Sequence, residues 1–116
     1  MAKVSVKRVY LPPDPADGCR VLVDRLWPRG LSKDKAQIDH WLKALAPSDA
    51  LRKWFGHEPA RWDEFRRRYF AELDDQPEAL APLRALLKQE KKLTLLFGAR
   101  DEAHNNAVAL KEYLRA

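Results

Sequence analysis

Two short, almost continuous apolar runs place the tightest limit on what this chain can fold into. Arg20–Leu26 reads RVLVDRL, and Leu93–Phe97 reads LTLLF. Trp27 and Pro28 interrupt the first run, and Gly98 ends the second. Both runs are predicted to be strands. Strands that lack apolar and polar alternation are typically buried on both faces, as in a parallel sheet.

Another strand and several helices are predicted around these two runs. Lys3–Tyr10 (KVSVKRVY) contains alternating β-branched residues, which predicts a strand. The proline-rich segment after it predicts a loop. Capping residues predict one helix over Lys33–Ala36, after Ser32, and another from Ser48 to Gly56. A third helix is predicted from Pro59, and its buried residues are Trp62, Phe65, Tyr69 and Leu73. Apolar spacing predicts a fourth helix around Leu80, Leu83 and Leu87, with Pro82 as an alternative first turn, and a fifth along Ala103, Ala107, Leu110 and Leu114.

The segment Gln37–Leu45 fits two patterns. Its apolar residues recur at helical spacing, but Ile38, His40 and Leu42 also alternate as they would in a strand. We expect a helix that continues into a short extended piece, and a strand remains the alternative.

The order of strand, helical middle, strand and helix predicts an α/β fold. We expect a small, mostly parallel sheet of three to four strands, flanked by helices. The 116 residues suit one domain that spans residues 1–116. Hydrophobic residues make up 46% of the chain, which is enough for a core that needs no disulfides.

Targeting and redox features are sparse. The single cysteine, Cys19, excludes an internal disulfide and fits a reducing compartment. The first residues lack the apolar run of a signal peptide. No apolar stretch approaches the roughly 20 residues of a membrane span. We therefore expect a cytoplasmic protein without membrane insertion, and the sequence does not specify its oligomeric state.

The formal net charge is +5, from 22 basic and 17 acidic residues. A basic balance favours anionic partners, either small anions and nucleotides or nucleic acid. An ordinary solvated surface carries a similar mild excess. Charge alone therefore leaves both interpretations open.

The loop after the Leu93–Phe97 strand is the first candidate site. Loops at the carboxyl ends of strands hold the ligands of open α/β sheets, and a helix N-terminus attracts anions. We expect Arg100 to grip an anion there, with Asp101 and Asn105 beside it. His104 is a candidate acid or base. In the alternative interpretation Asp101 is a helix N-cap and the polar residues form a solvated first turn.

The loop after the second predicted strand, DRLWPRG, is the other candidate. Arg25 and Arg29 are predicted to converge on the same anion. Arg8 reaches the same edge from the first strand, and Trp27 is either a core residue or a stacking surface. Asp24 ends an apolar strand, where an unpaired carboxylate is costly. It is therefore a structural partner of an arginine or a catalytic carboxylate.

Other chemistry lacks a motif. The chain has no Cys-x-x-Cys, His-x-x-x-His, Walker, dinucleotide-glycine or Gly-x-Ser-x-Gly pattern. We predict no metal site and no cofactor. His57 is interpreted as a cation at a helix C-terminus. Arg66–Arg68 spread around a helix and are interpreted as a solvated face.

Five motifs carry a family resemblance over almost the whole chain. VKRVY, GCRVLVDRLWPRG, APSDALRKWFGH, RWDEFRRRY and LLFGARDEAHNNA are similar to the domain-of-unknown-function family 488, in its short YeaO-like branch. The resemblance implies a bacterial-type cytoplasmic α/β protein without an established activity.

The wider family implies a thiol-bearing site that this chain lacks. Other branches carry a cysteine and a glutamate where Phe97 and Ala99 stand, and a cysteine–histidine motif near His104. This departure argues against thiol catalysis or cysteine metal binding here.

Three function classes remain. The first is a small anion- or phosphate-binding domain, as an enzyme or a sensor. The second is a nucleic-acid-binding module that uses a flat basic face over Arg66–Arg68 and Lys88–Lys92. The third is a protein-interaction domain with exposed tryptophans. We prefer the first, and whether it is an enzyme stays open.

Overall fold

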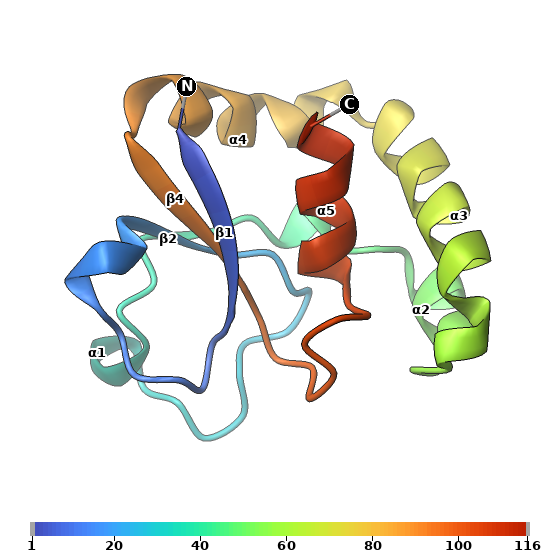
Figure 1. Cartoon of the computed structure of the whole chain (residues 1–116), viewed down its shortest axis with the longest axis horizontal. Coiled ribbons are helices and arrows are strands. Elements are labelled where there is room, and N and C mark those ends of the chain that lie inside the picture. The colour runs from blue at the N-terminus through green and yellow to red at the C-terminus, as the bar shows by residue number, and fades with distance from the viewer. Residues whose placement is uncertain (1, 116) are drawn as a thin grey trace.

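The structure is a computed structural model that describes residues 2–115, and its centre is a four-stranded sheet (Figure 1). The strands are β1 (Lys3–Arg8), β2 (Cys19–Leu22), β3 (His40–Trp41) and β4 (Lys92–Phe97). Their order is β1-β4-β2-β3, and every pairing is parallel. The predicted α/β fold is confirmed.

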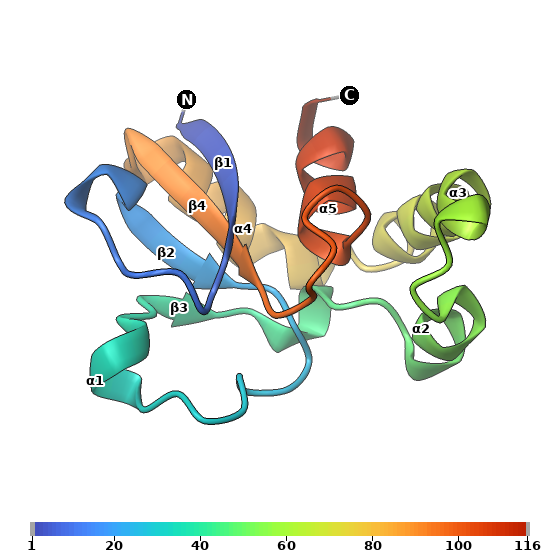
Figure 2. The same cartoon turned by 60° about the horizontal axis from the view of Figure 1, so that its bottom comes forward.

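Residues 2–115 form five α-helices, with α1 on its own near β3 and α2 to α5 on the other side of the sheet (Figures 1 and 2). They are α1 (Lys33–Ala36), α2 (Asp49–Phe55), α3 (Trp62–Asp74), α4 (Pro77–Gln89) and α5 (Asn106–Arg115). Serine caps begin α1 and α2 as predicted, because the Ser32 and Ser48 hydroxyls accept the Lys35 and Leu51 amides. Within residues 2–115 no helix has the length and apolar character needed to cross a bilayer.

The two faces of the sheet pack against hydrophobic cores of different size. Leu93, Leu95 and Phe97 of β4 point toward α2–α5 and join the main core. Leu96 and Leu22 point to the opposite face, where a smaller cluster includes residues of the segment between β2 and β3. Burial on both faces explains why these strands have near-continuous apolar sequences.

Both predicted N-terminal strands end earlier than expected. β2 stops at Leu22 and β1 at Arg8. Val23 still donates to the Leu96 carbonyl, but Asp24 uses its groups for other contacts. The prediction that the second strand extends to Leu26 is wrong, because its last residues form a loop.

The ambiguous segment Gln37–Leu45 is mostly not helical. Gln37 is left-handed (φ 48°) and ends α1. The Asp39 amide then donates to Arg20, and that of Leu42 to Leu22, which ties β3 to the edge of β2. A single 3-10 turn, Lys43–Leu45, follows. The expected helical continuation is wrong, and the short extended piece is confirmed.

Three helix boundaries also differ from expectation. Pro59 begins a 3-10 turn (Pro59–Arg61), and α3 follows at Trp62. Because α4 already begins at Pro77, Pro82 lies inside the helix and not in its first turn. The Pro82 side chain is exposed. Ala103 is exposed and precedes α5, so it does not belong to the core stripe of that helix.

Candidate functional site

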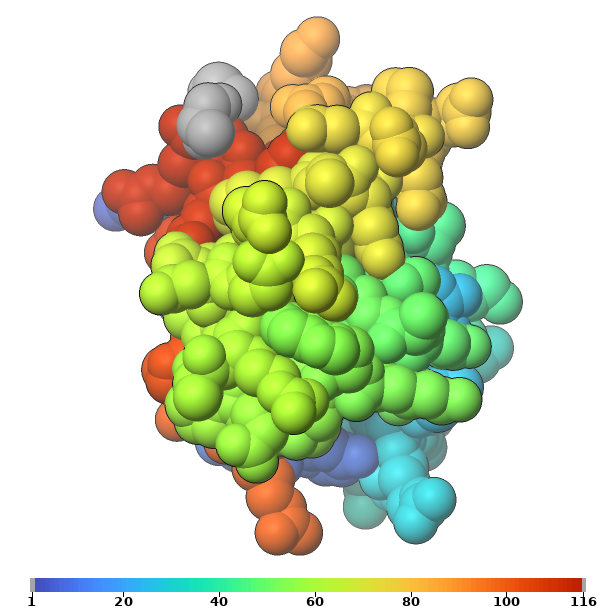
Figure 3. Space-filling view, turned by 90° about the vertical axis from the view of Figure 1, so that its right-hand side faces the viewer, coloured from blue at the N-terminus to red at the C-terminus, as the bar shows by residue number. Residues whose placement is uncertain are grey.

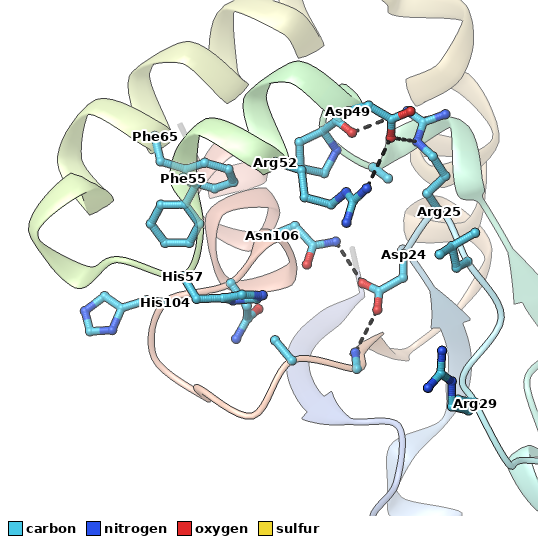
Figure 4. Close-up of a pocket in the computed structure, with 16 residues that line it drawn as sticks. Asp24, Arg25, Arg29, Asp49, Arg52, Phe55, His57, Phe65, His104 and Asn106 are labelled. Atoms are coloured by element: carbon cyan, nitrogen blue, oxygen red, sulfur yellow. Dashed lines mark hydrogen bonds and ion pairs between the residues drawn. The ribbon is translucent and has the colours of Figure 1, made fainter.

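A cavity of about 780 Å³ opens at the carboxyl ends of β2 and β4, beneath α2 (Figure 4). The loop after β2, the ends of α2 and the loop after β4 supply most of its lining. Its 16 lining residues are Asp24, Arg25, Leu26, Arg29, Ala46, Pro47, Asp49, Arg52, Phe55, His57, Phe65, Gly98, Ala99, His104, Asn105 and Asn106.

The two loops singled out in the sequence meet at this edge of the sheet. In the space-filling view segments from both loops project at the lower end of the molecule, the first in cyan on the right and the second in orange on the left (Figure 3). Parallel strands deliver their carboxyl ends to one edge, so the topology explains the meeting. The sheet therefore brings residues from sequence positions near 25 and near 100 into one cavity.

Asp24 joins the two loops. Its Oδ2 accepts the Gly98 amide at 2.8 Å, and its Oδ1 accepts the Asn106 side-chain amide at 3.1 Å. Its backbone carbonyl accepts the Trp41 indole N–H. The predicted arginine partner of Asp24 is replaced by these uncharged donors. Asp24 thereby holds the β2 end, the β4 end and the start of α5 together.

Burial raises the pKa of Asp24 above the ordinary 3.8, although the hydrogen bonds from Asn106 and Gly98 oppose that change. Desolvation penalises the carboxylate form, whereas the two donors favour it. Asp24 is thus easier to protonate than an exposed aspartate while still facing the cavity.

Three arginines line the cavity, and two of them, Arg25 and Arg52, share the carboxylate of Asp49. Arg25 Nε and Arg52 Nη2 each lie 3.6 Å from Asp49 Oδ1. These pairs are loose, and the side chains of Arg25 and Arg52 are 44% and 56% exposed. Arg29 is exposed on the same loop as Arg25. Figure 4 shows Arg25 and Arg52 on either side of Asp49, with Arg29 beyond Asp24.

The loop after β4 does not lead directly into a helix. Asp101 accepts the amides of Ala103 and His104 in a tight turn, and its Oδ2 lies 2.9 Å from His104 Nδ1. Asn105 caps α5 instead, because its Oδ1 accepts the Val108 amide. The alternative that Asp101 caps the helix is therefore wrong by four residues.

Hydrogen bonds hold the pKa of Asp101 below 3.8, chiefly those from the Ala103 amide and the His104 ring. The carboxylate fixes the His104 ring orientation and leaves Nε2 directed elsewhere. A pair of this type suits a general base if a substrate lies within reach.

The structure brings five of the predicted site residues to the cavity: Asp24, Arg25, Arg29, His104 and Asn105. Arg8, Trp27, Arg100 and Asp101 are not among its lining residues. The Arg8 guanidinium donates to the Ala99 carbonyl, and the Trp27 indole donates to that of Leu31. Arg100 is exposed. These four stay predictions as ligand-binding residues, without support from the cavity.

Sequence reasoning missed Arg52 and Asp49 and undervalued His57. Arg52 lies one turn after the predicted Ser48 cap, so the helix placed it correctly, but nothing in the sequence related α2 to the strand ends. His57 has a positive φ of 57° directly after the left-handed Gly56. This double left-handed corner turns the chain beside the cavity, and the Gly-His pair in WFGH is its only sequence signal.

The fold and the cavity define a small α/β domain with a charged cavity at the carboxyl edge of a parallel sheet. The chain belongs to the DUF488 family, because residues 3–116 match the model described as the inactive DUF488-N3 subclade. The resemblance inferred from the motifs is therefore confirmed.

Two bacterial proteins match the chain over nearly its whole length. An uncharacterised protein of Mycobacterium tuberculosis is 46% identical over 112 residues, covering 97% of this chain and 93% of the relative. The uncharacterised protein YeaO of Escherichia coli is 41% identical over 113 residues, covering 97% of each chain. No solved structure matches this chain.

Proposed function

We propose that this protein binds a small phosphate-type anion in the cavity at the carboxyl edge of its sheet, and that binding rather than turnover is its role. One observation carries the proposal: Arg25, Arg29 and Arg52 line one cavity together with two histidines. Guanidinium groups match phosphate and carboxylate oxygens in a two-point geometry.

The arginines are available for a ligand. At 3.6 Å, the contacts of Asp49 with Arg25 and Arg52 are longer than good charge-assisted hydrogen bonds. Exposed pairs of this kind contribute about 0–1 kcal/mol. A phosphate can therefore take over these guanidinium donors with little loss of protein stability.

Binding without turnover is supported by the residues present. The family model that matches the chain describes its subclade as inactive. None of the 16 lining residues is a cysteine, serine, threonine or tyrosine that would act as a nucleophile. Phe97, at the position where the family resemblance implies a cysteine in other branches, is buried in the core. Cys19 lies at the start of β2, and burial raises the pKa of its thiol to about 11.

A small anion is favoured over nucleic acid because the neighbouring basic run is neutralised. Arg66 pairs with Asp63 and Glu112, and Arg67 and Arg68 both pair with Glu64. This side of α3 therefore does not extend the cavity into a flat basic face. The protein-interaction alternative also lacks a specific feature: among the described large apolar side chains, the one exposed tryptophan is Trp41.

The test is ligand-dependent thermal melting and calorimetry at low salt, with phosphate, sulfate, nucleotides and short DNA and RNA. We expect small phosphates to raise the Tm of the wild type, with about 2.7 kcal/mol of added stability at a hundredfold excess over Kd. Arg52→Ala removes this shift. Arg67→Ala, which deletes the same charge on the outer side of α3, retains it.

Two results contradict the proposal. Stabilisation by DNA or RNA alone favours the nucleic-acid module. Equal stabilisation of wild type and Arg52→Ala by every anion indicates nonspecific ion effects rather than a site.

A further inference from the structure

We infer that the natural ligand joins a planar ring to its anionic group, because the cavity sets an aromatic and imidazole end against its arginine end. The chemical class is a phosphate monoester whose alcohol portion carries an aromatic or heteroaromatic ring, attached at the phosphate or beyond a sugar. This inference rests on the proposed anion-binding function and adds the second half of the ligand.

The two ends of the cavity are chemically distinct. Phe55, Phe65, His57 and His104 gather on one side of Figure 4, and Arg25, Arg52 and Arg29 on the other. Asn106 lies near the middle of the view, and Asp24 lies between Arg25 and Arg29. A ligand that contacts both ends must carry two different groups.

At the aromatic end of the cavity, the phenyl groups of Phe55 and Phe65 form a rigid apolar surface. Phe55 and Phe65 have ring centroids 4.4 Å apart, and their exposures are only 6% and 2%. Both belong to the main core, so their positions are fixed before any ligand arrives. Aromatic surfaces of this kind favour offset or edge contacts with another ring.

Two imidazoles form the rim above that surface. The His57 ring centroid lies 6.2 Å from that of Phe55, and His57 is exposed. The His104 ring lies edge-on to Trp62 at 5.3 Å, while Asp101 holds its Nδ1. Asp101 orients the His104 ring, and both imidazoles are at least partly open to solvent, so each can contact a ligand ring.

The size of the cavity also exceeds what an inorganic anion needs. Pockets for organic ligands typically measure about 300–1,000 Å³ and combine apolar walls with a few polar groups. The cavity measures about 780 Å³, and Ala46, Pro47 and Ala99 add to its apolar lining. An inorganic phosphate at the arginines leaves the apolar end without a partner.

Matched ligand pairs test this inference by calorimetry. The first pair is methyl phosphate and phenyl phosphate, and the second is ribose 5-phosphate and uridine 5′-monophosphate. We expect the ring-bearing member of at least one pair to bind about tenfold more tightly, as a favourable aromatic contact provides. The first pair places the ring at the phosphate, and the second places it beyond a sugar.

A variant of the rim locates the ring. His57→Asn keeps a residue that tolerates positive φ and removes the imidazole. It is expected to reduce the ring advantage, which is the affinity ratio within a matched pair, to about threefold. His40→Asn, at an exposed histidine of β3 outside the cavity lining, is the matched control. Ligand-induced NMR shifts of the His104 ring protons provide an independent readout.

The outcomes separate this inference from the proposed function. If the phosphates bind through Arg52 but neither ring adds affinity, the ring inference is overturned and anion binding stands. The inference is also overturned if a ring adds affinity without moving the His104 signals or responding to His57→Asn. If no phosphate compound binds, the proposed function fails and the inference fails with it.

Discussion

Asp17 and Asp49 each lie between two cationic side chains, but the two clusters differ in contact distance and in exposure to solvent. Asp17 Oδ2 lies 2.6 Å from Arg20 and 3.0 Å from Lys7, and the Arg20 side chain is only 4% exposed. Arg20 also donates to the carbonyls of Ala36 and Gln37. At the cavity, Asp49 has longer contacts to more exposed arginines.

The comparison distinguishes a charge cluster that stabilises the fold from one whose arginines can bind a ligand. In the buried cluster, the Arg20 donors are committed to partners within the protein, so it fixes the loop that follows α1. In the open cluster, the side chains of Arg25 and Arg52 are 44% and 56% exposed, and their contacts with Asp49 and of Arg25 with the Pro47 carbonyl are long, so these donors can change partner at small cost. The same residue types therefore serve the fold at one position and are free for a ligand at the other.

The largest expected effect is the loss of the buried carboxylate. Asp17→Ala should lower the free energy of unfolding by about 3–5 kcal/mol, because it leaves Arg20 buried without a counter-charge. Urea denaturation followed by circular dichroism measures this change. A loss below about 1 kcal/mol, the range of an exposed pair, would remove the distinction between the clusters.

A smaller effect is the pH dependence of Asp17 and Asp24, whose pKa values shift in opposite directions. Burial raises the pKa of Asp17, but the hydrogen bonds from Lys7, Asp14 and Arg20 outweigh it and hold the value below 3.8. Its stabilisation is thus complete above pH 3.8 and is lost as pH falls through the folded value. Asp24, with its raised pKa, instead reduces stability as pH rises from 3.8 through its folded value.

Carbon-13 NMR titration of the aspartate side chains checks these directions. The Asp24 carboxyl should titrate above 3.8 and the Asp17 carboxyl below it. Assignments come from Asp24→Asn and Asp17→Asn. Equal midpoints for the two carboxyls would contradict the contrast.

In the open cluster, Asp49→Asn should change ligand binding more than stability. Its unfolding free energy should change by less than about 1 kcal/mol, as for other exposed pairs. Removing one negative charge about 4 Å from a bound anion is worth about 1 kcal/mol, so phosphate should bind about fivefold more tightly. Calorimetry measures the affinity, and Asp63→Asn, at the exposed partner of Arg66, is the control. Weaker phosphate binding would show that Asp49 positions the arginines rather than competing for them.

The smallest expected effect belongs to Arg100. Because it is exposed and outside the cavity lining, Arg100→Ala should change the phosphate Kd by less than about twofold and the stability by less than about 0.5 kcal/mol. Calorimetry and urea denaturation measure both quantities. A loss as large as that of Arg52→Ala would restore Arg100 as the anion clamp expected from the sequence.

The strands and most helices were predictable because their signals are local. The apolar runs around Val21 and Leu95 are buried on both faces, and the Ser32 and Ser48 caps begin helices as expected. The ambiguity at His40 was resolved only by backbone pairing with β2, a contact that no local pattern encodes. The edge strand β3 therefore forms through tertiary contacts and not through local sequence preference.

The location of the candidate site could be predicted from the sequence, but the set of residues that line it could not. Both loops at the strand ends were identified, because a parallel sheet gathers its carboxyl ends at one edge. Arg52 entered from α2, whose docking beside that edge depends on packing across the main core. Arg100 was predicted to bind the anion because a helix was expected to begin beside it. A turn at Asp101 comes first, and α5 begins only at Asn106.

The strand order has a consequence for the time course of folding. β4 lies between β1 and β2, so Lys3 pairs with Lys92 and Cys19 with Leu93. During synthesis, the first two strands must wait for nearly the whole chain before either gains its long partner. Pairings so distant in sequence slow folding, because loop closure precedes the contacts that reward it. Until β4 emerges from the ribosome, the apolar strands made first remain exposed to other chains.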